Sequence, residues 1–339
     1  YSLHKVKINS VTPTLDSPFE CENVELNISS NLTDNRLYYH SQTGARYELL
    51  RTVDVSYTTQ TWATDKWIDT LVVEEGVTLS DKIIVPATLK DSTIYTIISD
   101  NFLQALNQPA DSISSTVYYS CAIDKHPTSI VTTRGTNKEN EEGRPIDPEM
   151  DPIDGSAPLD VLFVANGSEN VKYYKWQILK GDELLAERTN EAEERYLFND
   201  FGVYRVLVWV SNDKCQSDST EFSINVAGSK LLVPNVFTPN GDGMNDEFRV
   251  YYESIIEYEI WVYNRWGKLV YHSTDPARGW DGNINGKKAA EGAYFYVIRA
   301  KGADAEKGQK FIRKSKYKKQ APLGIYQLAG DINLLRGKK

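Results

Sequence analysis

Apolar residues along this chain either alternate with polar ones or run together for four to eight positions, and turn residues separate these segments. Residues 5–8, 24–28 and 203–210 are three examples, and their spacing predicts β-strands that are buried on one or both faces. Helical periodicity is weak, and residues 100–106, with Asp100 as N-cap, form the best short helix candidate. Short strands separated by Gly, Asn and Asp turns are typical of β-sandwiches, so the sequence predicts an all-β protein.

Two changes in composition divide the chain into three modules. Residues 137–154 contain three prolines and seven acidic residues in eighteen positions, which predicts an acidic, proline-containing linker. A second joint is expected at residues 227–229, after the apolar alternation of residues 222–226. The predicted domains are therefore 1–136, 155–228 and 229–339, and each is long enough for one β-sandwich.

Charge is distributed unevenly over the 339 residues, whose net charge is −9. Residues 229–339 hold 19 Lys and Arg against 12 Asp and Glu, so the preceding part carries the acidic excess. Much of the basic excess lies in residues 313–319, which we interpret as a solvated loop or edge strand. No nucleic-acid recognition motif accompanies this run, so we expect no nucleic-acid partner.

The composition and motifs also limit the class of protein. Apolar residues make up 40% of the chain and charged residues 25%, as in ordinary globular proteins. No stretch approaches the roughly 20 apolar residues that span a bilayer, so we expect no membrane-spanning segment. The chain starts at Tyr1 without a charged and apolar leader, so we expect that any signal peptide has been removed or lies outside this sequence.

A search for catalytic motifs favours a protein that is not an enzyme. The four histidines, His4, His40, His126 and His272, are scattered and show no metal-ligand spacing. The sequence contains no Gly-x-Ser-x-Gly nucleophile elbow, no phosphate-binding Gly-rich loop and no dinucleotide fingerprint. We therefore expect no catalytic residues and no required cofactor.

The three cysteines, Cys21, Cys121 and Cys215, lack the close spacing of a zinc site. Cys21 follows a turn and Cys121 ends a predicted strand, so a disulfide between them would join the two ends of the first domain. We predict this Cys21–Cys121 pairing, with two buried free thiols as the alternative. Cys215 would then be an unpaired thiol.

The middle module resembles PKD-type or immunoglobulin-like extracellular domains. The resemblance rests on residues 174–176, 198–206 and 208–212. Trp176 would fill the space between two sheets, and Gly202 would allow a turn before Tyr204, whose hydroxyl could hold a corner of the sandwich. Such domains are usually spacers or adhesion modules.

The third module contains four sequence blocks in a fixed order, at residues 233–248, 260–271, 279–286 and 291–297. Together with residues 330–336 they resemble the gliding-motility-associated C-terminal domain, which is the type B sorting domain of the bacterial type IX secretion system. The positions that carry the resemblance are Pro239, Asn240, Gly241, Asp242, Gly243, Asn264, Arg265, Trp266, Gly267, Trp280, Asp281, Gly282, Gly292 and Tyr294.

This resemblance implies an immunoglobulin-like β-sandwich in an exported Bacteroidetes protein. Such a protein would cross the inner membrane with a signal peptide, and an outer-membrane translocon would then read the sorting domain, with Arg265 as one residue that it contacts. The expected destination is the cell surface or the medium. In the family the last strand follows a Tyr-Lys-Lys segment directly, whereas here residues 320–329 intervene, which leaves the register of that strand open.

The first block of the third module has the composition of a cation-binding loop. Asn240, Asp242, Asn245 and Asp246 offer oxygen atoms within seven positions, and two glycines let the loop bend. Calcium takes six to eight such oxygens, and Asp281 could add one from another loop. The alternative is that these side chains only cap the backbone of a tight loop.

Two pairs of tryptophans have a structural and a binding interpretation. Trp266 and Trp280 are explained as core or rim residues of a sandwich, or as a platform that stacks on a sugar ring. Trp62 and Trp67 are explained most simply by strand packing, with an exposed ligand patch as the alternative.

Taken together, the sequence predicts three tandem immunoglobulin-like β-sandwich domains in a non-enzymatic exported protein. The last domain would direct export through the outer-membrane type IX translocon, and the domains before it would act in adhesion or as structural and interaction modules. The other partner would be a surface protein or a glycan. The alternative is a carbohydrate-binding accessory protein that captures glycans.

Overall fold

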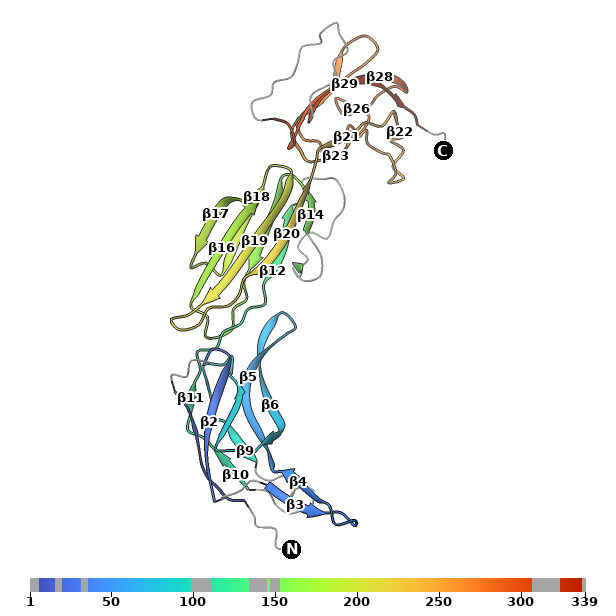
Figure 1. Ribbon diagram of the computed structural model, residues 1–339. Coiled ribbons are helices and arrows are strands. Elements are labelled where there is room, and N and C mark those ends of the chain that lie inside the picture. Colours follow the sequence, from blue (N-terminus) through green and yellow to red (C-terminus); the bar gives the residue numbers. More distant parts are fainter. Residues whose placement is uncertain are drawn as a thin grey trace.

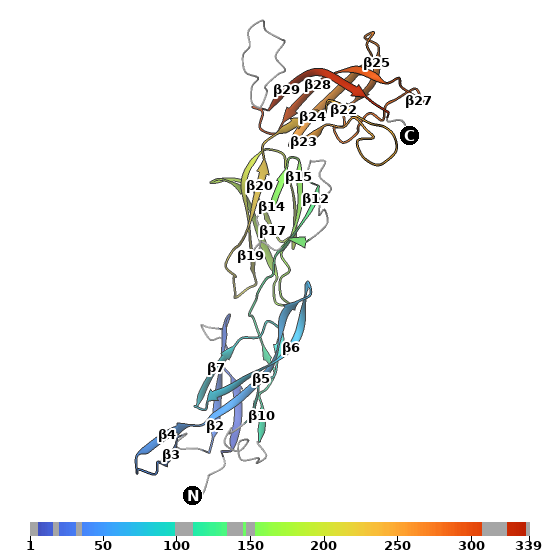
Figure 2. The ribbon, with the colours of Figure 1, turned by 90° about the vertical axis from the view of Figure 1, so that its right-hand side faces the viewer.

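The computed structural model describes residues 6–15, 20–31, 36–98, 111–133, 145–146, 153–306 and 324–336. All regular structure in these ranges is strand, arranged as three modules end to end (Figures 1 and 2). In these ranges we find no helix with the length and apolar character needed to cross a membrane. The helix expected at 100–106, the basic run at 313–319 and His4 lie outside the described residues.

The first module is a sandwich of two sheets whose strands alternate buried and exposed positions. Buried aliphatic residues such as Leu26, Val55 and Ile97 form its core. An additional hairpin of β3 (Arg36–His40) and β4 (Arg46–Leu50) extends from the sandwich at the end remote from the other modules (Figure 1). The three-stranded sheet has the order β1 (Ile8–Pro13), β2 (Asn23–Ser30), β7 (Lys82–Pro86), and the four-stranded sheet the order β10 (Ser112–Ser114), β9 (Thr96–Ile98), β5 (Thr52–Ala63), β6 (Lys66–Thr78); the short pairs are β3 (Arg36–His40) with β4 (Arg46–Leu50) and β8 (Ser92–Thr93) with β11 (Tyr118–Tyr119).

The middle module is a sandwich built around Trp176, as expected. The indole N–H of Trp176 donates a hydrogen bond of 2.9 Å to the carbonyl of Glu191, and the hydroxyl of Tyr204 donates one of 2.7 Å to the carbonyl of Asp200. The predicted corner therefore exists. One sheet has the order β13 (Pro145–Ile146), β12 (Thr128–Thr133), β15 (Leu159–Val164), β18 (Glu193–Phe198), and the other β14 (Ile153–Ser156), β20 (Thr220–Ala227), β19 (Gly202–Ser211), β16 (Tyr173–Lys180), β17 (Glu183–Thr189).

The boundary between the first two modules differs from the prediction of domains 1–136 and 155–228 with a linker at 137–154. Strand β12 pairs with β15, and its Val131 is buried in the core of the middle module. Strand β14, at the end of the predicted linker, pairs in parallel with β20 of the same module. The acidic segment therefore connects two strands of one sandwich. The apolar alternation before it belongs to β12, which packs in the module that follows it in the sequence and not in the one that precedes it.

The third module contains a five-stranded sheet whose last strand is fully paired. Strand β29 pairs with β28 over ten consecutive residue pairs, from Gly292 opposite Leu334 to Lys301 opposite Ile325. Residues 325–329 of the insertion thus form the first half of this strand, and its register is regular. The sheet has the order β22 (Val236–Phe237), β29 (Ile325–Leu334), β28 (Gly292–Gly302), β24 (Ile255–Tyr263), β25 (Leu269–Ser273); the short pairs are β21 (Lys230–Leu232) with β23 (Tyr251–Glu253) and β26 (Asn283–Ile284) with β27 (Lys287–Lys288).

Direct contacts join the middle and third modules near the expected joint at residues 227–229. The fully buried hydroxyl of Ser254 accepts a hydrogen bond of 3.0 Å from the backbone N–H of Ala157 and donates one of 2.5 Å to the carbonyl of Ala227. Ala303 of the third module packs into the core of the middle module. Because buried backbone groups require partners, Ser254 is a structural element of this joint.

Candidate functional site

The candidate site begins at the tight turn between β24 and β25, which Asn264 and Gly267 form. The side-chain oxygen of Asn264 accepts hydrogen bonds of 3.0 Å from the backbone N–H groups of both Trp266 and Lys268. Gly267 adopts a φ of +78°, which favours glycine, and its N–H donates to the carbonyl of Asn264. These two motif positions are therefore explained by the turn itself.

Arg265 and Trp266, at the tip of the same turn, have no such structural role. The Trp266 side chain is 74% exposed, and the guanidinium of Arg265 lies 4.2 Å from the centre of a Trp266 ring. This cation–π contact holds a flat aromatic surface and a positive charge together in solvent. The pair offers a partner protein an aromatic and a cationic contact side by side. We call Arg265 and Trp266 together the tip.

Strands β24 and β25, which the turn joins, and the neighbouring strand β28 carry large apolar side chains on the outer face of the sheet. Tyr263 lies opposite Phe295, and Trp261 lies opposite Val297, in the paired strands β24 and β28. Phe295 is 47% exposed, and Leu269 of β25, which pairs with Tyr263, is also exposed. We call these five residues the outer face. The sequence analysis missed them as a group, although the run from Trp261 to Tyr263 is apolar on both faces of its strand.

The third motif block builds the interior of the module. Trp280 is 1% exposed, and its indole N–H donates a hydrogen bond of 2.8 Å to the carbonyl of Asn283. Its ring packs on Tyr294, with 4.8 Å between ring centres, and the hydroxyl of Tyr294 donates to the carbonyl of Ala290 at 2.8 Å. Trp280 is therefore a core residue and offers no surface to a sugar.

The neighbouring motif positions shape the same corner. Asp281 accepts hydrogen bonds from the backbone and side-chain N–H groups of Asn283, at 2.9 and 2.7 Å. Gly282 has a φ of +71°, and a Cβ added there would stand 3.0 Å from Pro239 and 3.2 Å from Leu334. The site needs glycine both for its backbone conformation and for space. Gly292 also adopts a positive φ, at the start of β28.

In the Asn/Asp loop at residues 239–246, side-chain oxygens accept hydrogen bonds from the N–H groups of the loop's own backbone. The carboxylate of Asp246 accepts hydrogen bonds from the N–H groups of Asn240, Gly241 and Gly243, at 2.9, 2.7 and 2.8 Å. These donors hold the pKa of Asp246 below its usual range. Asp242 accepts from the side-chain amide of Asn240 at 2.7 Å.

These hydrogen bonds are the ones expected if the Asn and Asp side chains cap the backbone of the loop. Asn245 contributes through its backbone, because its carbonyl accepts from the N–H of Thr238 and its φ is +53°. Calcium binding by Asn240, Asp242, Asn245 and Asp246 stays a prediction. The loop borders a pocket of about 590 Å³, lined by Leu232, Val233, Pro234, Val236, Gly243, Asn245, Asp246, Glu247, Arg249 and Tyr251.

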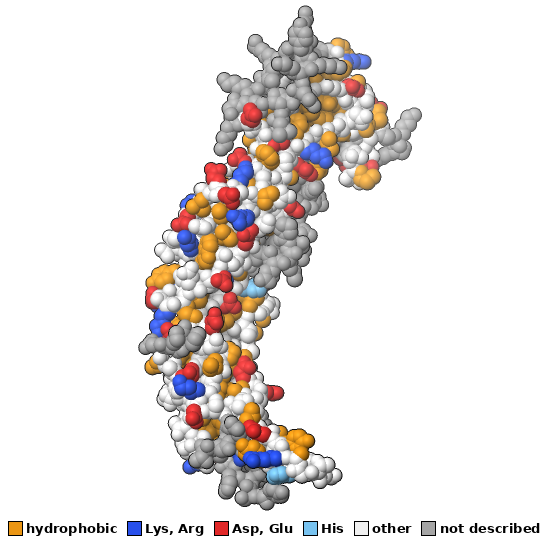
Figure 3. Space-filling view, viewed as in Figure 1, with side chains coloured by type: hydrophobic (Ala, Val, Ile, Leu, Met, Phe, Trp, Pro, Cys, Tyr) orange, Lys and Arg blue, Asp and Glu red, His pale blue; other side chains and the backbone are white. Residues whose placement is uncertain are grey.

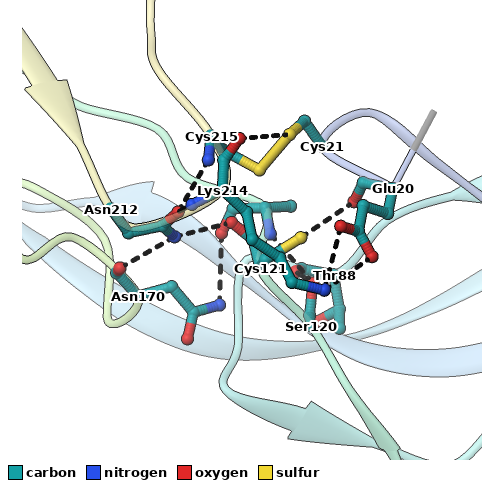
Figure 4. The surroundings of a disulfide bond; sticks show 10 residues. Glu20, Cys21, Thr88, Ser120, Cys121, Asn170, Asn212, Lys214 and Cys215 are labelled. Carbon is teal, nitrogen blue, oxygen red and sulfur yellow. Dashed lines mark hydrogen bonds and ion pairs between the residues drawn. A yellow bond between two sulfur atoms is a disulfide. The ribbon is translucent and has the colours of Figure 1, made fainter. Parts of the chain in front are cut away.

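A second group of predicted residues meets at the joint between the first and middle modules. The disulfide joins Cys21 to Cys215, and Cys121 is the free cysteine (Figure 4). The predicted Cys21–Cys121 pairing is therefore wrong. The turn between β19 and β20 carries Cys215 onto the end of the first module, so all three Sγ atoms lie within 4.8 Å of one another.

The tryptophans of the first module also lie in this joint. Trp62 and Trp67 flank the turn of the long β5–β6 hairpin. The indole N–H of Trp67 donates a hydrogen bond of 2.8 Å to the carbonyl of Asn166 in the middle module. The Trp62 ring stacks on His126, with 4.8 Å between ring centres. The aromatic pair that the sequence explained by strand packing, or by a ligand patch, thus packs between two modules.

The remaining histidines in the described part of the chain are far apart in the fold. His272 of β25 lies 3.0 Å from the carboxylate of Glu259 on β24, whereas His40 belongs to the β3–β4 hairpin of the first module. Among the described residues, the only group of three or more His, Cys, Asp and Glu side chains with metal-binding spacing is the cysteine cluster.

Comparison with known proteins assigns families to two parts of this chain. Residues 231–313 match the model of the CHU_C type IX secretion signal domain, and residues 14–115 match a fibronectin type III domain. No curated protein matches. Among solved structures, the chain is similar to the FN1–FN3 domains of chicken CNTN1, with 11% identity, 98% of each chain covered and a TM-score of 0.28.

Two further solved structures are similar at the same low level. The three N-terminal domains of the bacteriophage RB49 Hoc protein share 11% identity over 98% of this chain and 100% of that one, with a TM-score of 0.24. Dimeric latent PorU from Porphyromonas gingivalis shares 12% identity over 98% of this chain and 34% of that one, with a TM-score of 0.19. The family matches agree with the sandwiches described above: the chain carries a CHU_C type IX secretion signal domain in its third module and a fibronectin type III domain in its first, and it is an exported cargo of the type IX secretion system.

Proposed function

We propose that this chain is a non-enzymatic surface or secreted protein whose third module is recognised by the outer-membrane type IX translocon through the tip. One observation carries the proposal. The motif positions Asn264, Gly267, Trp280 and Gly282 are accounted for by turns and core packing, whereas Arg265 and Trp266 project into solvent. Residues that a module displays without needing them for its own fold are the natural contacts for a partner.

The chemistry of the tip suits recognition of a protein. Tryptophan and arginine are the residue types that most often dominate binding energy at protein interfaces. Burying an exposed aromatic side chain in an apolar pocket contributes about 1.5–3 kcal/mol. The outer face extends the apolar contact next to the tip, with Phe295 and Leu269 both exposed. A partner that contacts the tip and the outer face together would bury both the exposed tryptophan and these apolar side chains.

The test compares the export of full-length variants in a type IX-competent bacterium. Trp266→Ala and Arg265→Ala are expected to accumulate in the periplasm, because they remove the contact and leave the fold intact. The matched control is Ile256→Ala, which removes an exposed apolar side chain at the opposite end of β24. The proposal fails if both tip variants reach the outside in the same proportion as the wild type.

The first two modules are proposed to present an interaction surface away from the export signal. The β3–β4 hairpin lies at the opposite end of the molecule from the third module (Figure 1), and hydrophobic side chains show among the polar ones at that end (Figure 3). Tyr38, Tyr47, Leu49 and Leu50 of this hairpin are exposed. The proposal for these modules is an adhesion or structural role, in a Bacteroidetes protein delivered by a signal peptide. The exposed hairpin at the end of a row of sandwiches supports the adhesion role.

A second candidate function is glycan capture, and the aromatic part of the hairpin favours it. The guanidinium of Arg46 covers one face of the Tyr38 ring, 3.6 Å from its centre, and the exposed remainder of this aromatic side chain, with Tyr47 nearby on the hairpin, supports the proposal. Binding of the full chain to a glycan array, lost in Tyr38→Ala, would support this function. Binding to surface proteins but to no glycan would support adhesion instead.

A further inference from the structure

Three cysteines from three separate segments converge at the joint between the first and middle modules. Cys21 lies between β1 and β2, Cys121 follows β11, and Cys215 lies between β19 and β20. Their Sγ atoms all lie within 4.8 Å of one another, although only Cys21 and Cys215 are bonded (Figure 4). A free thiol therefore stands next to an existing disulfide, which is the arrangement that thiol–disulfide exchange requires.

One side chain holds Cys121 and Cys215 together. The amide nitrogen of Asn212 donates a hydrogen bond of 2.8 Å to the carbonyl of Cys121, and its oxygen accepts one of 2.8 Å from the N–H of Cys215. The backbones of both cysteines are thus fixed by the same carboxamide, independently of Cys21. A bond between Cys121 and Cys215 would leave these two hydrogen bonds in place.

We propose that the Cys121 thiolate attacks the Sγ of Cys215, forms a Cys121–Cys215 disulfide and releases Cys21. The Cys21–Cys215 bond breaks as the new bond forms, and the leaving Cys21 thiolate takes up a proton equivalent to the one that Cys121 lost to solvent. One disulfide and one thiol are present before and after, so the step needs no oxidant or reductant. The free thiol moves from position 121 to position 21, and the β1–β2 connection is no longer bonded to the middle module.

Burial decides which cysteine leaves. Cys215 is only 3% exposed, whereas Cys21 is partly exposed. A thiolate is stabilised by water, so expulsion of Cys21 costs less than expulsion of Cys215. The opposite attack, on Cys21, would leave the charge on the buried sulfur.

The groups around Cys121 leave the thiol able to react but lower the fraction of it that is thiolate, which slows the exchange. Burial raises the pKa of the Cys121 thiol, the Glu20 carboxylate raises it further, and the Lys214 ammonium lowers it. Lys214 and Glu20 form an ion pair of 3.0 Å beside the sulfurs (Figure 4). Cys121 also lines a pocket of about 390 Å³ together with Asn170, which gives solvent a route to the thiol.

The joint has noncovalent contacts that persist after the exchange. The side-chain amide of Asn170 donates to the carbonyls of Lys90 and Ala122, and the indole of Trp67 still reaches Asn166. Exchange therefore loosens the joint at the β1–β2 connection without separating the modules. The exchange moves the free thiol from position 121 to position 21, both of which are partly exposed, and removes one covalent attachment of the β1–β2 connection.

The test maps disulfides in the oxidised full-length chain. The native protein is incubated at about pH 8.5 to form thiolate, quenched with acid, labelled with N-ethylmaleimide under denaturing acidic conditions, and digested without reduction. Mass spectrometry should find a Cys121–Cys215 peptide together with labelled Cys21, in a proportion that grows with incubation time until it reaches a plateau. A Cys21–Cys215 peptide alone, with label only on Cys121 at every time, would overturn the proposal, and so would a Cys21–Cys121 peptide.

Two variants make the result independent of the exchange rate. Cys21→Ser, once oxidised, should form the Cys121–Cys215 disulfide and leave no free thiol. Two free thiols in that variant would mean that Cys121 and Cys215 cannot bond, which rules the proposal out. Cys121→Ser removes the only thiol and should keep the Cys21–Cys215 peptide as its single disulfide throughout. Loss of that bond in this variant, in which no molecule carries a thiol, would mean that a group other than Cys121 opens the disulfide, and would overturn the proposal.

Discussion

Alanine substitution of Trp280 and of Trp266, one at a time, distinguishes the core role of the first from the recognition role of the second. In Trp280→Ala the change deletes a fully buried indole that packs on Phe237 and Tyr294 and donates a hydrogen bond to the carbonyl of Asn283. Truncating a buried aromatic residue to alanine costs about 3–5 kcal/mol. In Trp266→Ala the change deletes a side chain that is 74% exposed, so the cost is limited to the cation–π contact with Arg265, about 0.5–1 kcal/mol.

Thermal unfolding of the full chain measures this difference. In a domain of this size 1 kcal/mol lowers the melting temperature by about 4–8 °C. The transition of the third module should therefore fall by about 12 °C or more in Trp280→Ala and by less than about 8 °C in Trp266→Ala. Trp280→Phe, which keeps most of the packing and loses the N–H donor, should lie between them. Equal destabilisation by the two alanine variants would refute the division into a core residue and a recognition residue.

Three further predictions concern the loop and the joint. Because the folded-state pKa of Asp246 is depressed, its contribution to stability is present above the unfolded pKa of about 4 and is lost as the pH falls through the folded value; Asp246→Asn should flatten the acid limb of the stability curve. If the loop binds calcium, a chelator should lower the melting temperature of the third module, and an unchanged value would exclude structural calcium there. Trp67→Phe should weaken the first joint by about 0.5–1.5 kcal/mol, seen as faster hydrogen exchange around Asn166, whereas unchanged exchange would show that the indole bond adds nothing.

The sequence predicts those features of this fold that local pattern determines. Alternating apolar residues identify the strands, and Trp176 and Tyr204 lie where a sandwich core and its corner require them. The sequence marked Asn264 and Gly267 only as motif positions, although the turn that they form is local, because its hydrogen bonds lie within five positions.

Features that depend on contacts between distant segments were not predictable from the same patterns. The disulfide joins residues 194 positions apart, and its partner was decided by how two modules meet, which no local pattern records. Judged from sequence alone, β12 could belong to the first sandwich. In the structure it pairs with β15 and belongs to the middle one. Asn and Asp side chains at loop spacing have the same composition whether they bind a cation or cap the backbone, so Asp246 was ambiguous for a chemical reason.

We expect the third module to be sufficient to direct export through the outer membrane. The most direct measurement fuses residues 229–339 to a periplasmic reporter that carries a signal peptide, in strains with and without the type IX translocon. Reporter should be found outside the cell only when both the module and the translocon are present, and it should stay in the periplasm when Trp266 of the fused module is replaced by alanine. Reporter outside the cell without the translocon, or retained in the periplasm when both are present, would contradict this expectation.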